Sequence, residues 1–157
     1  MMPLILASTS ATRQALLTAA GLHPQQQSPH LDEGPIKQSA QAAGKTAGET
    51  AYELAQAKAR AVSEKQGDCL VIGADQILEC DGVWFDKPVD RESARSQLLA
   101  LRGRTHQLWT AVATVKNSVV VWHHVAVAAL TMRSFSEAYL EAYLEQAGPN
   151  ILASVGG

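Results

Sequence analysis

Short apolar runs alternate with amphipathic segments in the first half of the chain, which is the pattern of an α/β protein. The run Leu4–Ala7 predicts a buried strand, and the hydroxyl-rich stretch after it predicts a turn and then a helix that stops at Gly21. Thr46 and Glu49 have the spacing of a capping box and open a second helix, which is expected to run toward Gly67. Residues 22–44 are mostly polar, and we expect extended chain and loop there.

The second half of the chain begins with a long apolar run and then repeats both kinds of pattern. Cys69–Cys80 is followed by Asp81 and Gly82 and then by Val83–Asp86, which predicts two strands joined by a two-residue hairpin turn. We therefore expect a mixed β-sheet flanked by helices. The remaining pattern predicts a helix between Asp90 as N-cap and Gly103, an antiparallel strand pair that turns at Lys116–Ser118, and a helix capped by Ser134 or Ser136.

Lys58 interrupts the apolar face of the predicted second helix. Its neighbours three and four positions away are all apolar, namely Leu54, Ala55, Ala61 and Val62. The ammonium group either passes the small alanines to reach water or points into a cavity that holds an anion. Helical periodicity alone leaves both interpretations open.

Asp75 interrupts the long apolar run in a similar way. Strand alternation places it on the same face as Val71, Gly73 and Ile77, while Gln76 points to the other face. Because an unpaired buried carboxylate is costly, some nearby group must compensate its charge. Asp75 is either one partner of a buried salt bridge, or it is a metal-binding carboxylate or a general base.

Composition and charge narrow the class of protein. The 157 residues are 46% hydrophobic and 18% charged, as in a folded soluble domain, and a formal net charge of −2 argues against a general nucleic-acid binder. Cys69 and Cys80 match no metal-ligand spacing and no disulfide framework, which indicates reduced thiols in a cytoplasm. No apolar run approaches the roughly 20 residues of a membrane span. We therefore expect a single cytoplasmic domain over residues 1–157 that contacts neither nucleic acid nor membrane.

Several polar residues have ordinary explanations singly but form a chemically coherent set together. Two carboxylates, Glu33 and Asp75, would hold a cation. Phosphoryl transfer requires neutralised oxygens, a divalent metal and an oriented water, so the set matches the hydrolysis of a polyphosphate. The groups available for anionic oxygens are Ser8, Ser10, Arg13, Lys58 and Lys87.

Five segments carry a resemblance to a known family. They are, in chain order, LILASTSATRQALL, LDE, AQAKA, IGADQIL and DKPVDRESARSQLLALRGRTHQLWTAV. In this order and spacing the chain resembles the Maf (septum formation inhibitor) nucleotide pyrophosphatases. The resemblance implies a fold like that of the inosine-triphosphate pyrophosphatases, with two lobes and a central cleft. It also implies that a nucleoside triphosphate is hydrolysed to the monophosphate and pyrophosphate with Mg²⁺ or Mn²⁺.

The resemblance also assigns roles and leaves alternatives. Asp75 would be the general base, and Glu33 would help it to hold the metal. His106 and Thr110 match a further motif with a supporting role. A homodimer is plausible for the family, and the alternative function is a regulator of cell division that acts by binding a partner. The residues implied to contact the triphosphate are Ser8, Ser10, Arg13, Lys58 and Lys87.

Two positions bear on the base of the nucleotide. Family members that act on thymidine or uridine triphosphate have an arginine at the position of Thr12 and a threonine at that of Gln76. Gln76 instead resembles the subgroup that acts on 7-methyl-GTP, although that subgroup has a large aromatic residue in place of Thr12. Gln76 therefore favours the 7-methyl-GTP subgroup, and Thr12 leaves the base pocket unassigned. The family continues for roughly forty residues past the final ASVGG segment, so we expect a C-terminal part to be lacking.

Overall fold

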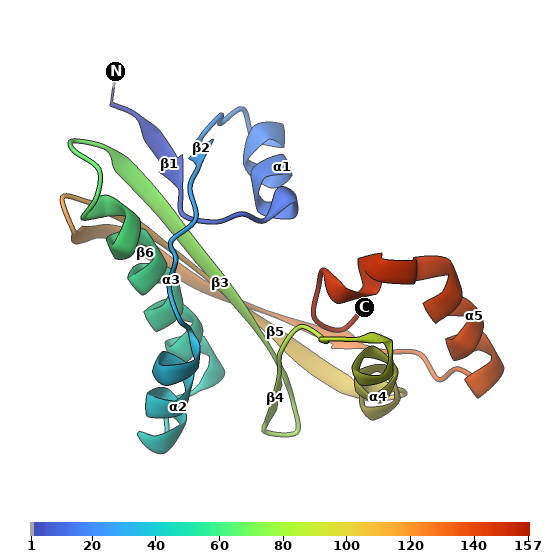
Figure 1. Ribbon diagram of the computed structural model, residues 1–157. Coiled ribbons are helices and arrows are strands. Elements are labelled where there is room, and N and C mark those ends of the chain that lie inside the picture. Colours follow the sequence, from blue (N-terminus) through green and yellow to red (C-terminus); the bar gives the residue numbers. More distant parts are fainter. Residues whose placement is uncertain (1) are drawn as a thin grey trace. The chain divides into compact units, whose positions relative to one another are not determined.

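A computed structural model describes residues 2–157, and the elements named here are those of this part of the chain. The strands are β1 (Leu4–Leu6), β2 (Gln25–Gln26), β3 (Leu70–Cys80), β4 (Val83–Phe85), β5 (Thr105–Lys116) and β6 (Val119–Thr131). The helices are α1 (Ala11–Ala19), α2 (Gly34–Ala42), α3 (Ala47–Ser63), α4 (Arg91–Leu101), α5 (Glu137–Ala147) and the 3₁₀ helix η1 (Gly148–Leu152). Figure 1 shows them in order along the chain.

The strands form one mixed sheet. Its order is β2-β1-β3-β5-β6, and β4 pairs with β3 outside this path. β1 runs parallel to both β2 and β3, whereas β3 and β4 are antiparallel. Positive φ angles at Asp81 and Gly82 and at Asn117 and Ser118 give the left-handed turns that two-residue hairpins require. The predicted α/β class and mixed sheet are confirmed.

The chain divides into two compact units. The first comprises the residues up to Gln76 together with Thr110–Ala126, and the second comprises Ile77–Trp109 and Val127–Gly157. β3, β5 and β6 contribute residues to both units. The core of the first unit lies between α3 and the sheet, and its buried members are Ile5, Ala7, Ala59, Val62, Cys69, Val71 and Val115. In the second unit α4 and α5 pack together around Ala94, Leu98, Leu140, Leu144 and Ile151.

The predicted helix starts are confirmed by their caps. Thr46 and Glu49 form the full capping box of α3, and the side chains of Asp90 and Ser136 accept the first-turn amides of α4 and α5. α3 ends at Ser63, before the expected stop at Gly67. Among the described residues, no helix has the length and apolar character that crossing a membrane requires.

The expectation of extended chain and loop over residues 22–44 is wrong for α2, whereas the short strand β2 agrees with extended chain. α2 escapes sequence analysis because it begins with Gly34 and Pro35 and buries only Ala40, so it lacks a strong apolar stripe. Its start is instead fixed by Asp32, whose Oδ1 accepts the Gly34 amide at 3.1 Å. The helix is short, but it places the residue before it, Glu33, beside α3.

Candidate active site

α3 and β3 approach each other closely in the first unit. A Cβ atom on Gly73 would overlap the carbonyl oxygen of Ala55 and lie 2.9 Å from the Cβ atom of Ala59, so only glycine fits there. Alanines repeat along this face of α3, which lets the helix lie directly against the strand (Figure 1). The close contact brings Lys58 of α3 next to Asp75 of β3.

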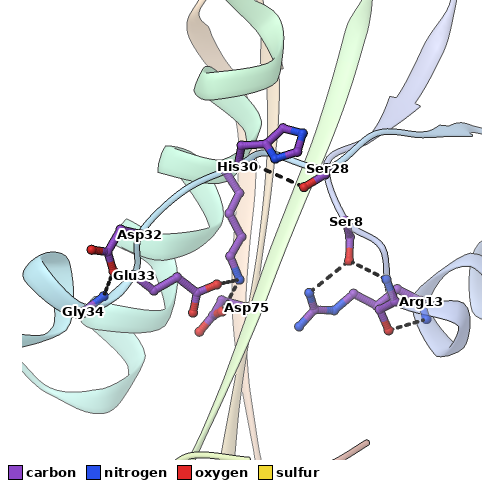
Figure 2. A network of polar contacts seen from close by, with 10 residues as sticks. Ser8, Arg13, Ser28, His30, Asp32, Glu33, Gly34 and Asp75 are labelled. Carbon is purple, nitrogen blue, oxygen red and sulfur yellow. Dashed lines mark hydrogen bonds and ion pairs between the residues drawn. The ribbon is translucent and has the colours of Figure 1, made fainter.

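Lys58 joins two carboxylates from different elements. Its Nζ atom donates to Asp75 Oδ1 at 2.6 Å and lies 2.6 Å from Glu33 Oε1. Figure 2 shows the Glu33 and Asp75 carboxylates turned toward the same ammonium group. Lys58 is only 7% exposed and Asp75 only 5%, which excludes the interpretation in which the lysine reaches water. The charge compensation expected for Asp75 is supplied by this lysine.

The second oxygen of Asp75 has a different environment. Oδ2 is buried and has no hydrogen-bond partner among the described residues. Burial raises the pKa of Asp75 above its ordinary value, while the charge and hydrogen bond of Lys58 act in the opposite direction. A buried acceptor without a partner is rare in folded proteins and calls for an explanation such as a ligand, an ion or a reacting water.

The side chain of Glu33 can reach Lys58 because it does not cap α2. It occupies the N-cap position of α2, but its side chain makes no capping hydrogen bond. The preceding residue, Asp32, binds the Gly34 amide instead, as Figure 2 shows. The Glu33 side chain is 36% exposed, so this end of the cluster is open to solvent while Asp75 is not.

A loop of hydroxyl groups follows β1 in the same unit. Ser10 is the N-cap of α1, and Ser8 Oγ accepts the Ser10 amide at 3.1 Å and Arg13 Nη1 at 3.5 Å. The guanidinium of Arg13 also lowers the pKa of Asp75, although less than Lys58 does. Figure 2 shows Arg13 extending from α1 toward the region of the Asp75 carboxylate. A helix N-terminus with hydroxyls and an arginine favours negative charge.

Gln26 supports this loop and was not predicted from the sequence. It lies opposite Leu6 in the parallel pairing of β1 and β2, and its Nε2 donates to the carbonyl oxygens of Ser8 at 3.3 Å and Ser10 at 3.1 Å. Nothing in a polar, glutamine-rich segment marks one glutamine as a partner of this loop. The interaction becomes visible only once the strand pairing is known.

The remaining predicted site residues are divided between the two units. Gln76 is exposed on the strand face opposite Asp75 and donates to Thr110 Oγ1 at 2.9 Å, while Thr12 is exposed on α1. Lys87 belongs to the second unit, where it is exposed in the segment after β4. His106, in the same unit, is buried, and burial lowers its pKa.

The structure thus brings Ser8, Ser10, Arg13, Glu33, Lys58 and Asp75 together within the first unit.

The residues present fit a hard divalent cation with a small protein ligand set. The described chain contains no group of three or more His, Cys, Asp or Glu side chains suited to hold a metal. Mg²⁺, however, is usually held by one or two carboxylates together with substrate phosphates and waters. Glu33 and Asp75 already share one cationic group, and Asp75 Oδ2 has no partner. This pair of carboxylates is therefore suited to such a cation.

Comparison with known structures supports the class of fold. The structure resembles that of a HAM1 protein from Coxiella burnetii with a TM-score of 0.52 and 18% sequence identity. The match covers 82% of this chain and 71% of the other. The likeness in fold agrees with the expected similarity to this group of α/β proteins.

Sequence comparison identifies the family. The profile described as "Maf-like protein" matches residues 3–157, and the chain belongs to the Maf family. A nucleoside triphosphate pyrophosphatase of Paramagnetospirillum magneticum is 48% identical over 97% of this chain and 78% of its own length. One from Nitrobacter hamburgensis is 50% identical, over 98% of this chain and 75% of that protein. A 7-methyl-GTP pyrophosphatase of Mesorhizobium japonicum is 42% identical, over 98% and 77% respectively.

Proposed function

We propose that this protein hydrolyses a nucleoside triphosphate to the nucleoside monophosphate and pyrophosphate. The single observation that carries the proposal is the buried Asp75 carboxylate, with one oxygen bound to Lys58 and the other without a partner. Such an acid is compensated enough to ionise and still has an acceptor atom available. The names of the Maf relatives support the same activity.

The chemical step follows from the free oxygen of Asp75. Asp75 Oδ2 accepts a proton from a water molecule as the water oxygen attacks the α-phosphorus. The bond from the α-phosphorus to the bridging oxygen of the β-phosphate breaks, and that oxygen leaves with pyrophosphate. A divalent cation held by Glu33 and Asp75 would supply charge neutralisation for the phosphate oxygens. The raised pKa of Asp75 makes it a better proton acceptor than an ordinary aspartate once it is ionised.

Phosphate binding is assigned to the loop after β1. Ser8 and Ser10 offer hydroxyl groups, Arg13 offers a charged fork, and the first amides of α1 point out of the helix end. Gln26 holds the carbonyl oxygens of this loop, so those oxygens face β2 rather than a bound anion. Lys58 is the further cationic group of the first unit that we propose to contact the triphosphate.

For the base we propose a preference for 7-methyl-GTP or a similar modified nucleotide. Gln76 follows Asp75 in β3 but lies on the other face of the strand. Its amide nitrogen is engaged with Thr110 there, which leaves its carbonyl oxygen available to accept from a base. The 7-methyl-GTP pyrophosphatase of Mesorhizobium japonicum is one of the relatives. Guanine offers ring and exocyclic N–H donors to such an acceptor, whereas thymine and uracil offer one ring N–H.

A substrate panel tests both parts of the proposal. The protein is incubated with 7-methyl-GTP, GTP, dTTP and UTP in the presence of Mg²⁺ or Mn²⁺, and pyrophosphate and monophosphate are measured. We expect equal amounts of the two products, with 7-methyl-GTP turned over faster than dTTP and UTP. Absence of pyrophosphate from every nucleotide would overturn the activity. Faster turnover of dTTP or UTP would overturn only the preference.

A further inference from the structure

The position between Glu33 and Asp75 is held by the ammonium group of Lys58. One Nζ atom lies 2.6 Å from an oxygen of each carboxylate, and no other pair of described residues shows this arrangement with comparable burial. The proposed function places a divalent cation at the same two carboxylates. The lysine and the cation would therefore bind the same two carboxylates. The resemblance to the family implied only a phosphate-binding role for Lys58.

Electrostatics makes simultaneous occupancy unfavourable. A divalent cation that used both carboxylates would lie close to the ammonium group of Lys58, a residue that is only 7% exposed, and repulsion between like charges is poorly screened there. The lysine also uses Asp75 Oδ1, which leaves Oδ2 as the one unengaged oxygen of that carboxylate. For both carboxylates to hold a cation, Lys58 must give up one or both of its contacts.

A triphosphate offers Lys58 an alternative partner. Arg13 is the other cationic group whose charge acts on Asp75, and its side chain donates to Ser8, so it does not compete for the Lys58 position. The anionic oxygens of a bound nucleotide can receive the ammonium group with charge-assisted hydrogen bonds. Lys58 can then leave the carboxylates without being buried as an unpaired charge.

We propose that Lys58 excludes divalent cations from Glu33 and Asp75 in the free protein and releases these carboxylates when a triphosphate binds. This inference rests on the proposed function, because the triphosphate is the anion that draws the lysine away. Cation and nucleotide then bind with positive coupling, and by thermodynamic reciprocity each tightens the other. The free protein is kept from holding a metal ion that has no substrate to act on.

The test measures Mn²⁺ binding to the protein alone, by electron paramagnetic resonance of the free ion and by calorimetry. We expect Lys58→Met to bind Mn²⁺ about tenfold or more tightly than the wild type, because a positive charge between the two ligands has been removed. The matched control is Lys45→Met, which removes an exposed lysine paired with Glu53 and should leave Mn²⁺ affinity unchanged. Adding Glu33→Gln to Lys58→Met should abolish the gain and so locate the bound ion.

Thermal unfolding keeps the test decisive if Lys58→Met folds poorly. For the wild type, Mn²⁺ alone should leave the melting temperature nearly unchanged, while Mn²⁺ with α,β-methylene-GTP should raise it more than the separate effects combined. For Lys58→Met, Mn²⁺ alone should raise the melting temperature or restore a cooperative transition.

Two results would overturn the inference. One is a wild-type protein that binds Mn²⁺ as tightly as Lys58→Met, with Glu33→Gln abolishing binding in both. The other is a wild-type melting temperature that Mn²⁺ raises equally with and without the nucleotide analogue. Neither measurement depends on turnover, so failure of the proposed hydrolysis in the substrate panel would be recognised separately.

Discussion

Two clusters of ion pairs in this protein have similar geometry but very different surroundings. In the first unit Lys58 lies 2.6 Å from Asp75, and their side chains are 8% and 7% exposed. In the second unit Arg95 Nε lies 2.6 Å from an oxygen of Glu141, and these side chains are 28% and 46% exposed. The distance between the charges is the same, so distance does not decide what each pair contributes.

The two ion pairs differ in their contribution to folding because one is buried and the other is exposed. Water competes with the surface pair and screens it, so Arg95 and Glu141 add little to folding even though each shifts the pKa of the other in the favourable direction. The buried pair loses hydration that it recovers only while both partners are present. The cluster around Lys58 is therefore poorly explained by a contribution to stability, and it is better explained by the chemistry of its carboxylates.

The largest effect on folding is expected for Lys58→Met. Loss of the ammonium leaves Asp75 buried without a counter-charge, and we expect the free energy of unfolding at neutral pH to fall by about 3–5 kcal/mol. Urea denaturation in the absence of divalent cations measures this. The double variant Lys58→Met with Asp75→Asn should recover part of the loss. If Lys58→Met lowered the free energy of unfolding no more than replacement of an exposed lysine such as Lys45 does, burial would not determine what the ion pair contributes.

Gly73→Ala should have the next largest effect. The added methyl group meets the backbone of α3, so the helix must move away from β3 and carry Lys58 with it. We expect a loss of about 1–3 kcal/mol in unfolding free energy together with reduced turnover. Gly67→Ala is the control, because a Cβ atom there has nothing within 4 Å. Equal stabilities of the two variants would show that α3 and β3 are less tightly packed than described.

The stability of the protein should depend on pH through the buried Asp75 carboxyl group. Burial raises the pKa of Asp75, so the folded protein keeps this proton to a higher pH than the unfolded chain does. The stability of the wild type relative to Asp75→Asn should therefore be greatest at acid pH, below the ordinary aspartate pKa, and fall as pH rises through the raised pKa. Metal-free denaturation curves of both proteins across this range test the sign. A relative stability that rises with pH would contradict it.

The smallest effect is expected for Arg95→Met. The guanidinium is solvated and also lies near Glu137, so the carboxylates that lose it regain water rather than becoming buried charges. The unfolding midpoint in urea should move far less than for Lys58→Met, and turnover should be unchanged. A shift comparable to that of the buried lysine would mean that burial is not the deciding variable.

Local sequence patterns predicted most of the fold, because caps, hairpin turns and strand alternation are local. Asp90 before α4 and the Asp81–Gly82 turn are examples that the structure confirms. α2 was missed because its start depends on Asp32 and Pro35 rather than on an apolar stripe.

The candidate site was only partly predictable from the sequence. The strand pattern indicates that Asp75 needs a compensating charge, but Lys58 lies 17 residues away in the chain. Helical periodicity does not say which group faces a side chain. Whether the lysine reached water or an anion became clear only with the packing of α3 on β3. The role of Gln26 likewise depends on the pairing of β1 with β2, which no local pattern reveals.

The most direct test of the account is pyrophosphate release by Asp75→Asn. Asparagine keeps the size of the side chain but cannot accept the proton of the attacking water, so we expect turnover to fall by about 10²–10⁴-fold with the cooperative unfolding transition retained. The assay compares initial rates for the wild type and the variant with the preferred nucleotide and Mg²⁺. Wild-type turnover by a correctly folded Asp75→Asn protein would contradict the central claim that this buried carboxylate is the catalytic base.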